Sequence, residues 1–383
     1  MPSNPTQFSI YVRGFLRFGV ALLYLYMCGF ALWQSYYYPI RNFDALAYSA
    51  AALKWGYEDK ALWHKAVKEE AAKTLSASEQ AELITQNKRA SKPEALAAQM
   101  PFYNAKPLFV AAVWAGIKAG LPGLEAVRYL ALAATALLMV LCFFVAAPGV
   151  NRSVWRLLVL AFFFAFSYPI NVIARLPTPD SLAALVCMVA LLAVLSRRSL
   201  ALWFSASAVA LCVRPDSLLL TLPLGVALVR SQNQERDGHL FAGGAVCLLI
   251  GLWALKHYTA AYGLGVAVEY YVVNPTAAPE LLPGELPAAY YLMLFQHAVM
   301  PAAGSLQFLA LAGWSVLALI IGWRYWQEDA LPVRCLLAGW LFGLFKLALF
   351  PLWDEALLYA AYLVIFTSSL AVIATHPKLG GKR

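Results

Sequence analysis

The stretch VALLYLYMCGFALWQSYYY, from Val20 to Tyr38, decides the fold class of this 383-residue chain. It contains no charged residue, and a helix of this length and composition crosses the hydrocarbon core of a bilayer. The stretch is too long for the apolar part of a signal peptide, and it lacks a small-residue cleavage pattern. We therefore expect it to stay attached as the first membrane span.

The composition of the whole chain also indicates a membrane protein. Hydrophobic residues make up 62% of the chain and charged residues 13%, whereas soluble domains have roughly 45–50% and about 25%. A chain with so little polar surface does not fold as a water-soluble enzyme of one or two domains. The sequence therefore predicts an all-α, polytopic integral membrane protein.

Further apolar runs predict about ten transmembrane helices, within a single membrane domain that comprises residues 1–383. We expect these helices at about residues 15–38, 124–147, 154–172, 180–196, 199–213, 217–230, 239–260, 304–324, 332–350 and 356–375. Two long segments between the runs, 39–123 and 261–303, are expected to lie outside the bilayer.

The basic residues predict the orientation of the spans. The formal net charge is +9, and the excess positive charge lies in short links at 148–153, 197–198, 230–238 and 324–334, and in the tail 376–383. Such links are cytoplasmic by the positive-inside rule, so both termini are cytoplasmic and the two long segments face outward. In a bacterium this outer side of the inner (plasma) membrane is the periplasm. The distribution also predicts contacts with membrane lipid and no nucleic-acid partner.

The first outer segment, 39–123, is expected to contain interfacial helices. Asp44–Trp55 keeps its apolar side chains near one another, and Pro107–Ala119 is apolar but too short to span a bilayer. Both patterns are typical of helices that lie on the membrane surface.

Mixed charges mark one other part of the outer segments, and proline and tyrosine mark another. Residues 58–98 carry mixed charges and predict a solvated helical hairpin, with Ser76 or Ser78 as a helix cap before Glu79. The segment 261–303 is rich in proline and in tyrosines such as Tyr271. This aromatic density suits either an interfacial belt or a lid over a lipid-linked substrate.

Ionisable side chains are costly near a membrane, so their positions along the chain are informative. In the predicted topology the following residues all lie at the outer face: Asp44, Lys106, Arg175, Asp180, Arg214 and Asp216. The span centres carry almost no charge, whereas an ion-coupled transporter places charged groups near the midplane. The pattern indicates chemistry at the outer membrane–water boundary.

A carboxylate and several cations at that boundary suit the transfer of a sugar from a lipid phosphate. Breakage of the anomeric C–O bond leaves additional negative charge on the phosphate, and nearby cations stabilise that charge. A carboxylate takes the proton from the acceptor hydroxyl. A single base opposite the departing group gives inversion at the anomeric carbon.

Three motifs carry a resemblance to a known family. They are Arg41-Asn-Phe-Asp44, Met100-Pro-Phe-Tyr-Asn-Ala-Lys106-Pro107-Leu108 and Arg175-Leu-Pro-Thr-Pro-Asp180-Ser. Their order, spacing and shared outer placement resemble the GT-C glycosyltransferases, integral membrane enzymes that use polyprenyl-phosphate sugars. The pattern is most similar to that of the aminoarabinose, mannosyl and arabinofuranosyl transferases. The resemblance covers about the first 230 residues, including Arg214-Pro-Asp216.

The resemblance implies a GT-C-like fold and roles for three of these residues. Asp44 would be the general base, Lys106 would bind the donor phosphate, and Asp180 would orient the substrate or a neighbouring cation. Some relatives have paired acids in the first loop, but Asp44 is followed by Ala45, so we expect no metal and no cofactor. The implied donor is a polyprenyl-phosphate sugar, and the acceptor is a glycolipid, a glycan or a protein.

Four further residues are candidates for the same site. Arg175 and Arg214 are candidates for the donor phosphate, because a guanidinium group clamps two phosphate oxygens. Tyr103 is a candidate donor of a hydrogen bond to that phosphate. Asp216 is a supporting residue beside Arg214 in the Arg-Pro-Asp turn.

Each candidate also has a purely structural alternative. Asp44 and Asp180 are both placed to cap the helix that they open. Lys106 suits an interfacial anchor. Arg175 and Arg214 suit interfacial anchors or ion-pair partners for Asp180 and Asp216, and Tyr103 suits the aromatic belt.

The sequence as a whole predicts an inverting glycosyltransferase whose active site faces the periplasm. A transporter or flippase for a lipid-linked sugar stays open as an alternative. It would need charged groups on a path through the midplane, for which the candidates are Lys346, Arg128 and Lys256. A noncatalytic membrane scaffold that binds partners through the hairpin 58–98 is the third possibility.

Overall fold

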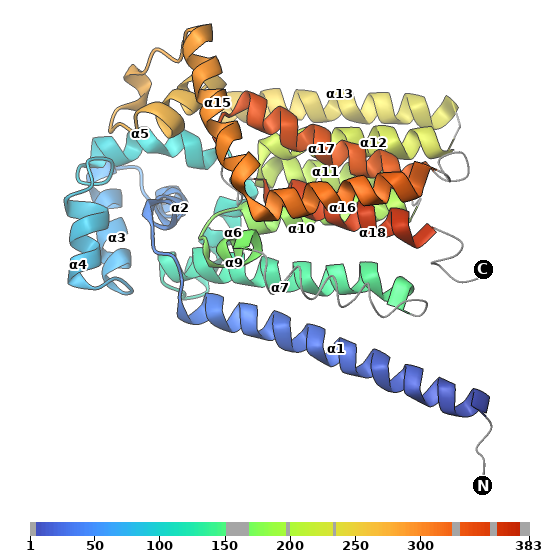
Figure 1. Cartoon of the computed structure of the whole chain (residues 1–383). Coiled ribbons are helices and arrows are strands. Elements are labelled where there is room, and N and C mark those ends of the chain that lie inside the picture. The colour runs from blue at the N-terminus through green and yellow to red at the C-terminus, as the bar shows by residue number, and fades with distance from the viewer. Residues whose placement is uncertain are drawn as a thin grey trace.

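The computed structural model describes residues 5–150, 168–196, 200–232, 235–323, 330–352 and 358–375. Every regular element in these ranges is helical, and none is a strand, which confirms the all-α prediction. Figure 1 shows two parts, a bundle of roughly parallel helices and a smaller group of helices at one end of it. We call this smaller group, Phe43–Lys118, the outer cap.

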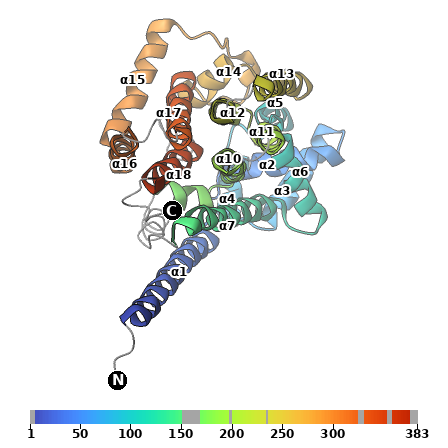
Figure 2. The ribbon, with the colours of Figure 1, turned by 90° about the vertical axis from the view of Figure 1, so that its right-hand side faces the viewer.

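The bundle contains helices from both halves of the chain. They are α1 (Pro5–Tyr37), α7 (Gly123–Val150), α10 (Asp180–Leu195), α11 (Leu200–Val213), α12 (Leu218–Gln232), α13 (Glu235–Tyr258), α16 (Leu306–Trp323), α17 (Leu331–Leu349) and α18 (Tyr359–Thr375). The short α9 (Tyr168–Arg175) precedes α10 at the cap end. Seen along the bundle in Figure 2, α10, α11 and α12 lie near the middle and α1 extends away from the rest.

Four helical segments of the described ranges are long and apolar enough to cross a membrane. They are Phe18–Tyr37, Gly123–Cys142, Asp237–Tyr258 and Leu331–Leu349. A fifth span results if α15 (Ala288–Gly304) and α16 count together, although the chain bends by 81° between them. The shorter apolar helices α10, α11 and α18 run alongside these segments. The chain is therefore compatible with an integral membrane protein, while the number of ten spans stays a prediction. Most of the expected run 154–172 lies outside the described residues.

The two ends of the bundle differ in which parts of the chain lie there. α1 begins and α18 ends at the end away from the cap, as Figure 1 shows. Arg230, in the last turn of α12, and Arg334, in the first turn of α17, lie at that same end. This matches the expected separation of the basic links from the long outer segments.

The outer cap is built from short helices around its own apolar core. They are α2 (Phe43–Leu53), α3 (Lys60–Ala72), α4 (Ala77–Gln80), a π-helical turn (Ala81–Thr85), α5 (Pro93–Asn104) and α6 (Pro107–Lys118). Trp63 is buried in this core, and its indole N–H donates to the Ala50 carbonyl at 2.8 Å. The two helices expected at Asp44–Trp55 and Pro107–Ala119 are present as α2 and α6, but α2 is buried along most of its length in the core of the cap. Their position on a membrane surface stays a prediction. The expected cap at Ser76 forms a capping box with Glu79.

The second outer segment folds over the cap end of the bundle. α14 (Leu264–Val268) runs into a π-helical turn (Glu269–Val273), and a 3₁₀ turn (Pro279–Leu281) follows. The Glu269 carboxylate accepts a hydrogen bond from the Gly284 backbone N–H at 2.9 Å. A Cβ atom at position 265 would overlap the Gly284 carbonyl, so glycine is needed there. These contacts hold the two ends of the segment from Gly263 to Gly284 together. We call this segment the covering loop.

Close packing between the bundle helices makes a prediction at Gly225 of α12. A Cβ atom there would overlap the Trp203 ring and lie 2.6 Å from Phe241 Cε2. Trp203 is buried and its indole N–H is bonded to the Thr221 carbonyl, so the ring has little room to move. We expect Gly225→Ala to lower the apparent melting temperature in detergent by about 5 °C, since overpacking costs about 1–3 kcal/mol.

The matched control for this substitution is Gly243→Ala on α13. No atom lies within 4 Å of a Cβ placed at Gly243, and alanine is the better helix former. This variant is expected to unfold at or slightly above the wild-type temperature. Equal melting temperatures for the two variants would show that α11, α12 and α13 are not packed as described.

Candidate functional site

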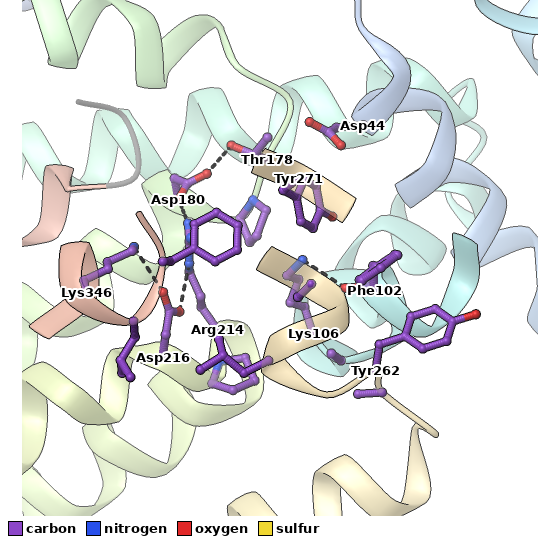
Figure 3. A pocket seen from close by; sticks show the side chains of 18 of the residues that line it. Asp44, Phe102, Lys106, Thr178, Asp180, Arg214, Asp216, Tyr262, Tyr271 and Lys346 are labelled. Carbon is purple, nitrogen blue, oxygen red and sulfur yellow. Dashed lines mark hydrogen bonds and ion pairs between the residues drawn. The ribbon is translucent and has the colours of Figure 1, made fainter. Parts of the chain in front are cut away.

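A cavity of about 430 Å³ lies where the outer cap meets the bundle (Figure 3). Its volume is in the range of small-molecule sites. Six charged side chains line it: Asp44, Lys106, Asp180, Arg214, Asp216 and Lys346. Much of the remaining wall is apolar, including Phe102, Leu219, Leu264, Leu349, Phe350 and Leu352. The cavity therefore suits an amphiphilic ligand with a charged group.

Two of the cations are placed by the same local rule, a basic residue followed by proline. Proline disfavours helical backbone in the residue before it. Lys106 accordingly lies in a non-helical break between α5 and α6, and Arg214 is extended between α11 and a 3₁₀ turn (Pro215–Ser217). Each break presents the basic side chain at the cap end of the bundle. Pro107 also opens α6, whose N-terminus has an electropositive backbone.

Arg214 is the centre of an ion network in which Asp180 and Lys346 are buried and Asp216 is partly exposed. Its guanidinium pairs with Asp180 and also with Asp216, whose Oδ1 lies 2.9 Å from Arg214 Nε. Lys346 Nζ, from the last turn of α17, lies 3.0 Å from the other Asp216 oxygen. Thr178 donates a hydrogen bond of 2.6 Å to Asp180. The network joins three separate parts of the chain at one wall of the cavity.

The network also fixes the charge of Asp216. Burial by itself raises the pKa of this carboxyl, but Arg214 and Lys346 outweigh burial and hold the pKa well below its usual range. Asp216 is therefore ionised at neutral pH.

Asp44 lies on the other side of the cavity and has no cationic partner among the described residues. The Tyr103 hydroxyl donates to Asp44 Oδ1 at 2.7 Å. Burial, and the Asp44 charge after it, raise the pKa of Tyr103, so this hydroxyl stays a neutral donor. Asn42 caps α2 by accepting from the Ala45 N–H. The expected alternative of Asp44 as the helix cap is therefore wrong.

Lys106 is the one cavity-lining cation that makes no ion pair with a described residue. Its Nζ donates to the Phe102 carbonyl at 3.0 Å, and it lies 5.5 Å and 5.6 Å from the ring centroids of Tyr48 and Tyr103. Burial, followed by repulsion from Arg214, lowers the pKa of Lys106 to about 8. An anion bound in the cavity would favour the protonated form.

The structure brings most of the predicted residues together. Asp44, Lys106, Asp180, Arg214 and Asp216 line the same cavity, and Tyr103 lies directly behind Asp44. Asp180 is the first residue of α10 but makes no side-chain cap, because Pro179 is the N-cap residue. The alternative of Asp180 as a helix cap is therefore also wrong. Its carboxylate forms an ion pair with Arg214 instead.

Arg175 does not reach the cavity. Its Nε donates to the Tyr38 carbonyl at 2.6 Å, just beyond the end of α1. Arg128 donates to the Tyr36 carbonyl in the same region. Basic side chains commonly satisfy free carbonyls at a helix C-terminus, and this accounts for both arginines. Asp180 pairs with Arg214, and a position of Arg175 at a membrane interface stays a prediction.

Lys346 and Tyr271 are among the residues that line the cavity without having been assigned to this site from the sequence. From the sequence, Lys346 was considered only as a candidate for a transport path. A lone charge in an apolar run is nevertheless a general sign of a functional position. Tyr271 appeared only as one of many aromatics, because no sequence pattern indicates that the covering loop turns it into the cavity.

The carboxylates of the cavity are not arranged as a metal centre. Asp180 and Asp216 are both paired with Arg214, and Asp44 accepts from Tyr103. Within the described ranges no group of three or more His, Cys, Asp or Glu side chains is placed to hold a metal ion.

Comparison with known proteins adds no identification. No protein-family model, curated protein or solved structure matches the chain. Its function therefore has to be argued from the geometry of the cavity.

Proposed function

We propose that this chain is an inverting glycosyltransferase of the GT-C type, which transfers a sugar from a polyprenyl-phosphate donor to an acceptor at the periplasmic face of a bacterial inner membrane. One observation carries the proposal. A carboxylate without a cationic partner, Asp44, and a cation without a carboxylate partner, Lys106, line the same cavity within the described part of the chain. The acceptor is a glycolipid, a glycan or a protein.

The cation side of the cavity suits the donor phosphate. Lys106 makes no ion pair with a described carboxylate, although the charges of Asp44 and Asp216 act on it from across the cavity. Arg214 supplies a second positive group. The apolar wall formed by residues such as Leu349 and Phe350 suits the first isoprene units of the lipid. Positive charge placed at the leaving phosphate stabilises the transition state more than the ground state.

Asp44 suits the general base. As the acceptor oxygen bonds to the anomeric carbon, its proton passes to Asp44. The C–O bond to the phosphate breaks at the same time, and its electron pair leaves with the polyprenyl phosphate. A single displacement of this kind inverts the anomeric centre. Every group that this scheme uses belongs to the chain or to its two substrates.

The geometry favours transfer over transport. The three candidates for a transport path are Lys346, Arg128 and Lys256. Lys346 and Lys256 lie in the last turns of α17 and α13, and Arg128 lies near the start of α7. None of the three is in the middle of its helix. An ion-coupled path through the bundle would need charged groups there.

The proposal is tested with purified protein in detergent, where no second compartment exists. The substrates are polyprenyl phosphate that carries a radiolabelled sugar and an envelope extract as the source of acceptors. Time-dependent transfer of label to the extract supports a glycosyltransferase. Tight binding of the donor without transfer of label to any fraction would favour a transporter instead.

The pKa of Lys106 predicts how donor recognition depends on pH. Lys106 attracts the donor phosphate only when protonated, so kcat/KM for the donor should fall as the pH rises through about 8. Between pH 7.5 and pH 9 we expect a fall of about eightfold from the loss of protonated Lys106. Initial rates at low donor concentration measure this change.

The matched variant for this measurement is Lys106→Arg. Arginine stays protonated throughout the range, so the variant should lose most of the fall while it retains transfer. A fall of equal size in Lys106→Arg would assign the titration to another group and contradict the role of Lys106.

A further inference from the structure

The covering loop is held in place by buried polar contacts, and this fixes the direction of its side chains. The Tyr270 hydroxyl donates to Gln99 Oε1 at 2.5 Å, and Gln99 Nε2 donates to the carbonyls of Thr276 and Ala277 at 3.3 Å. Gln99 and Tyr270 are 0% and 1% exposed. Together with the contact of Glu269 to Gly284, these bonds anchor both sides of the π-helical turn.

The next residue along this turn, Tyr271, faces the cavity. Its ring contacts those of Phe102 and Phe350, with centroids 5.3 Å and 5.9 Å away. Yet 37% of Tyr271 stays exposed, whereas Tyr48 and Tyr103 beside it are 3% and 2% exposed. Tyr271 therefore lines the cavity as an aromatic residue that its neighbours cover only in part.

The position of Tyr271 in the cavity suits contact with the sugar of the donor. Asp44, Lys106 and Tyr271 line the same cavity, and in the view of Figure 3 the Tyr271 ring appears between the Asp44 carboxylate and the Lys106 ammonium group. In an inverting transfer the base and the leaving phosphate lie on opposite sides of the anomeric carbon. The sugar ring therefore lies in the part of the cavity between Asp44 and Lys106, and Tyr271 lines the wall of this cavity.

We propose that Tyr271 forms a sugar subsite, in which its ring packs against the C–H face of the sugar carried by the donor. This inference rests on the proposed function and names the part of the donor that the covering loop recognises. Aromatic rings present a flat apolar surface with polarised C–H and π groups. Tyr271 therefore selects for a sugar on the polyprenyl phosphate and contributes nothing to binding of the bare phosphate.

The test compares two ligands in binding to purified protein in detergent. One is polyprenyl phosphate, and the other is polyprenyl phosphate carrying mannose, arabinofuranose or aminoarabinose, whichever the wild type binds most tightly. We expect Tyr271→Ala to weaken binding of the sugar-bearing lipid by about fivefold or more. Binding of bare polyprenyl phosphate should change by less than about twofold, and Tyr271→Phe should resemble the wild type with both ligands.

Two other variants separate this subsite from other roles. Tyr262→Ala removes another aromatic ring that lines the cavity, and it should leave the ratio of the two affinities unchanged. Asp44→Asn should retain the same ratio, because it keeps both the ring and the cations. Equal weakening of both ligands by Tyr271→Ala would overturn the sugar subsite, as would a loss in Tyr271→Phe as large as that in Tyr271→Ala. Failure of the wild type to bind either lipid would instead overturn the proposed function.

Discussion

Replacement of Asp44 by asparagine is expected to lower kcat for sugar transfer by about 10³-fold, the range that general base catalysis supplies. The substitution keeps the shape of the side chain. The Tyr103 hydroxyl still has an oxygen to donate to, in place of the carboxylate oxygen at 2.7 Å. Asn42 still caps α2, because its Oδ1 accepts from the Ala45 N–H. The substitution disturbs only the long contact of 3.5 Å from Asn42 Nδ2 to Asp44 Oδ2. Fold and donor affinity should therefore be retained while proton removal is lost.

A second variant tests whether Asp44 is the base or only a structural partner of Tyr103. Tyr103→Phe removes the hydrogen bond but leaves the carboxylate, so we expect a loss of about tenfold. Rates with the labelled donor, together with the melting temperature and donor binding of both variants, measure these effects. Transfer at the wild-type rate by Asp44→Asn would contradict the mechanism.

Replacement of Arg214 by methionine is expected to have the second large effect, on stability as well as on activity. The arginine side chain is 16% exposed and pairs with Asp180, which is 8% exposed. Removal of one partner from a buried ion pair costs about 3–5 kcal/mol. It also leaves two carboxylates on the cation side of the cavity, where they repel a phosphate. We expect kcat/KM to fall by about 100-fold or more and the melting temperature to fall with it.

The Asp180→Asn substitution separates the two effects. In the Arg214→Met background it removes the unpaired buried charge, so it should recover part of the lost stability. It should not recover transfer, because the guanidinium at the phosphate is still missing. Arg214→Met with donor affinity within about threefold of the wild type would show that Arg214 has a structural role only.

Much of the fold could be predicted because a bilayer leaves so few choices. Apolar runs such as Val20–Tyr38 identify membrane helices, and the capping box at Ser76 and the proline at position 107 mark helix starts in the cap. The number of spans is less certain from sequence, because short helices such as α11 (Leu200–Val213) lie inside the same bundle as the long ones.

The candidate site was only partly predictable, because some of its residues are placed by local sequence and others by contacts between distant parts of the chain. Asp44, Lys106 and Arg214 lie in breaks between or at the start of helices, and those breaks are local features that the sequence indicates. The roles of Arg175 and Lys346 depend on which parts of the chain meet. Arg175 meets the end of α1 at the Tyr38 carbonyl, and Lys346 meets Asp216 because α17 returns beside α12. Nothing in the local sequence determines these pairings.

The identity of the lipid held by the Asp44→Asn variant tests the assignment of this cavity most directly. This variant should bind the donor without consuming it. Protein purified in mild detergent from cells that encode the chain is analysed by native mass spectrometry, beside Lys106→Ala prepared in the same way. We expect a polyprenyl phosphate carrying one sugar on Asp44→Asn and little or none on Lys106→Ala. If both variants carry only bulk phospholipid, the assignment of this cavity to a lipid-linked sugar is contradicted.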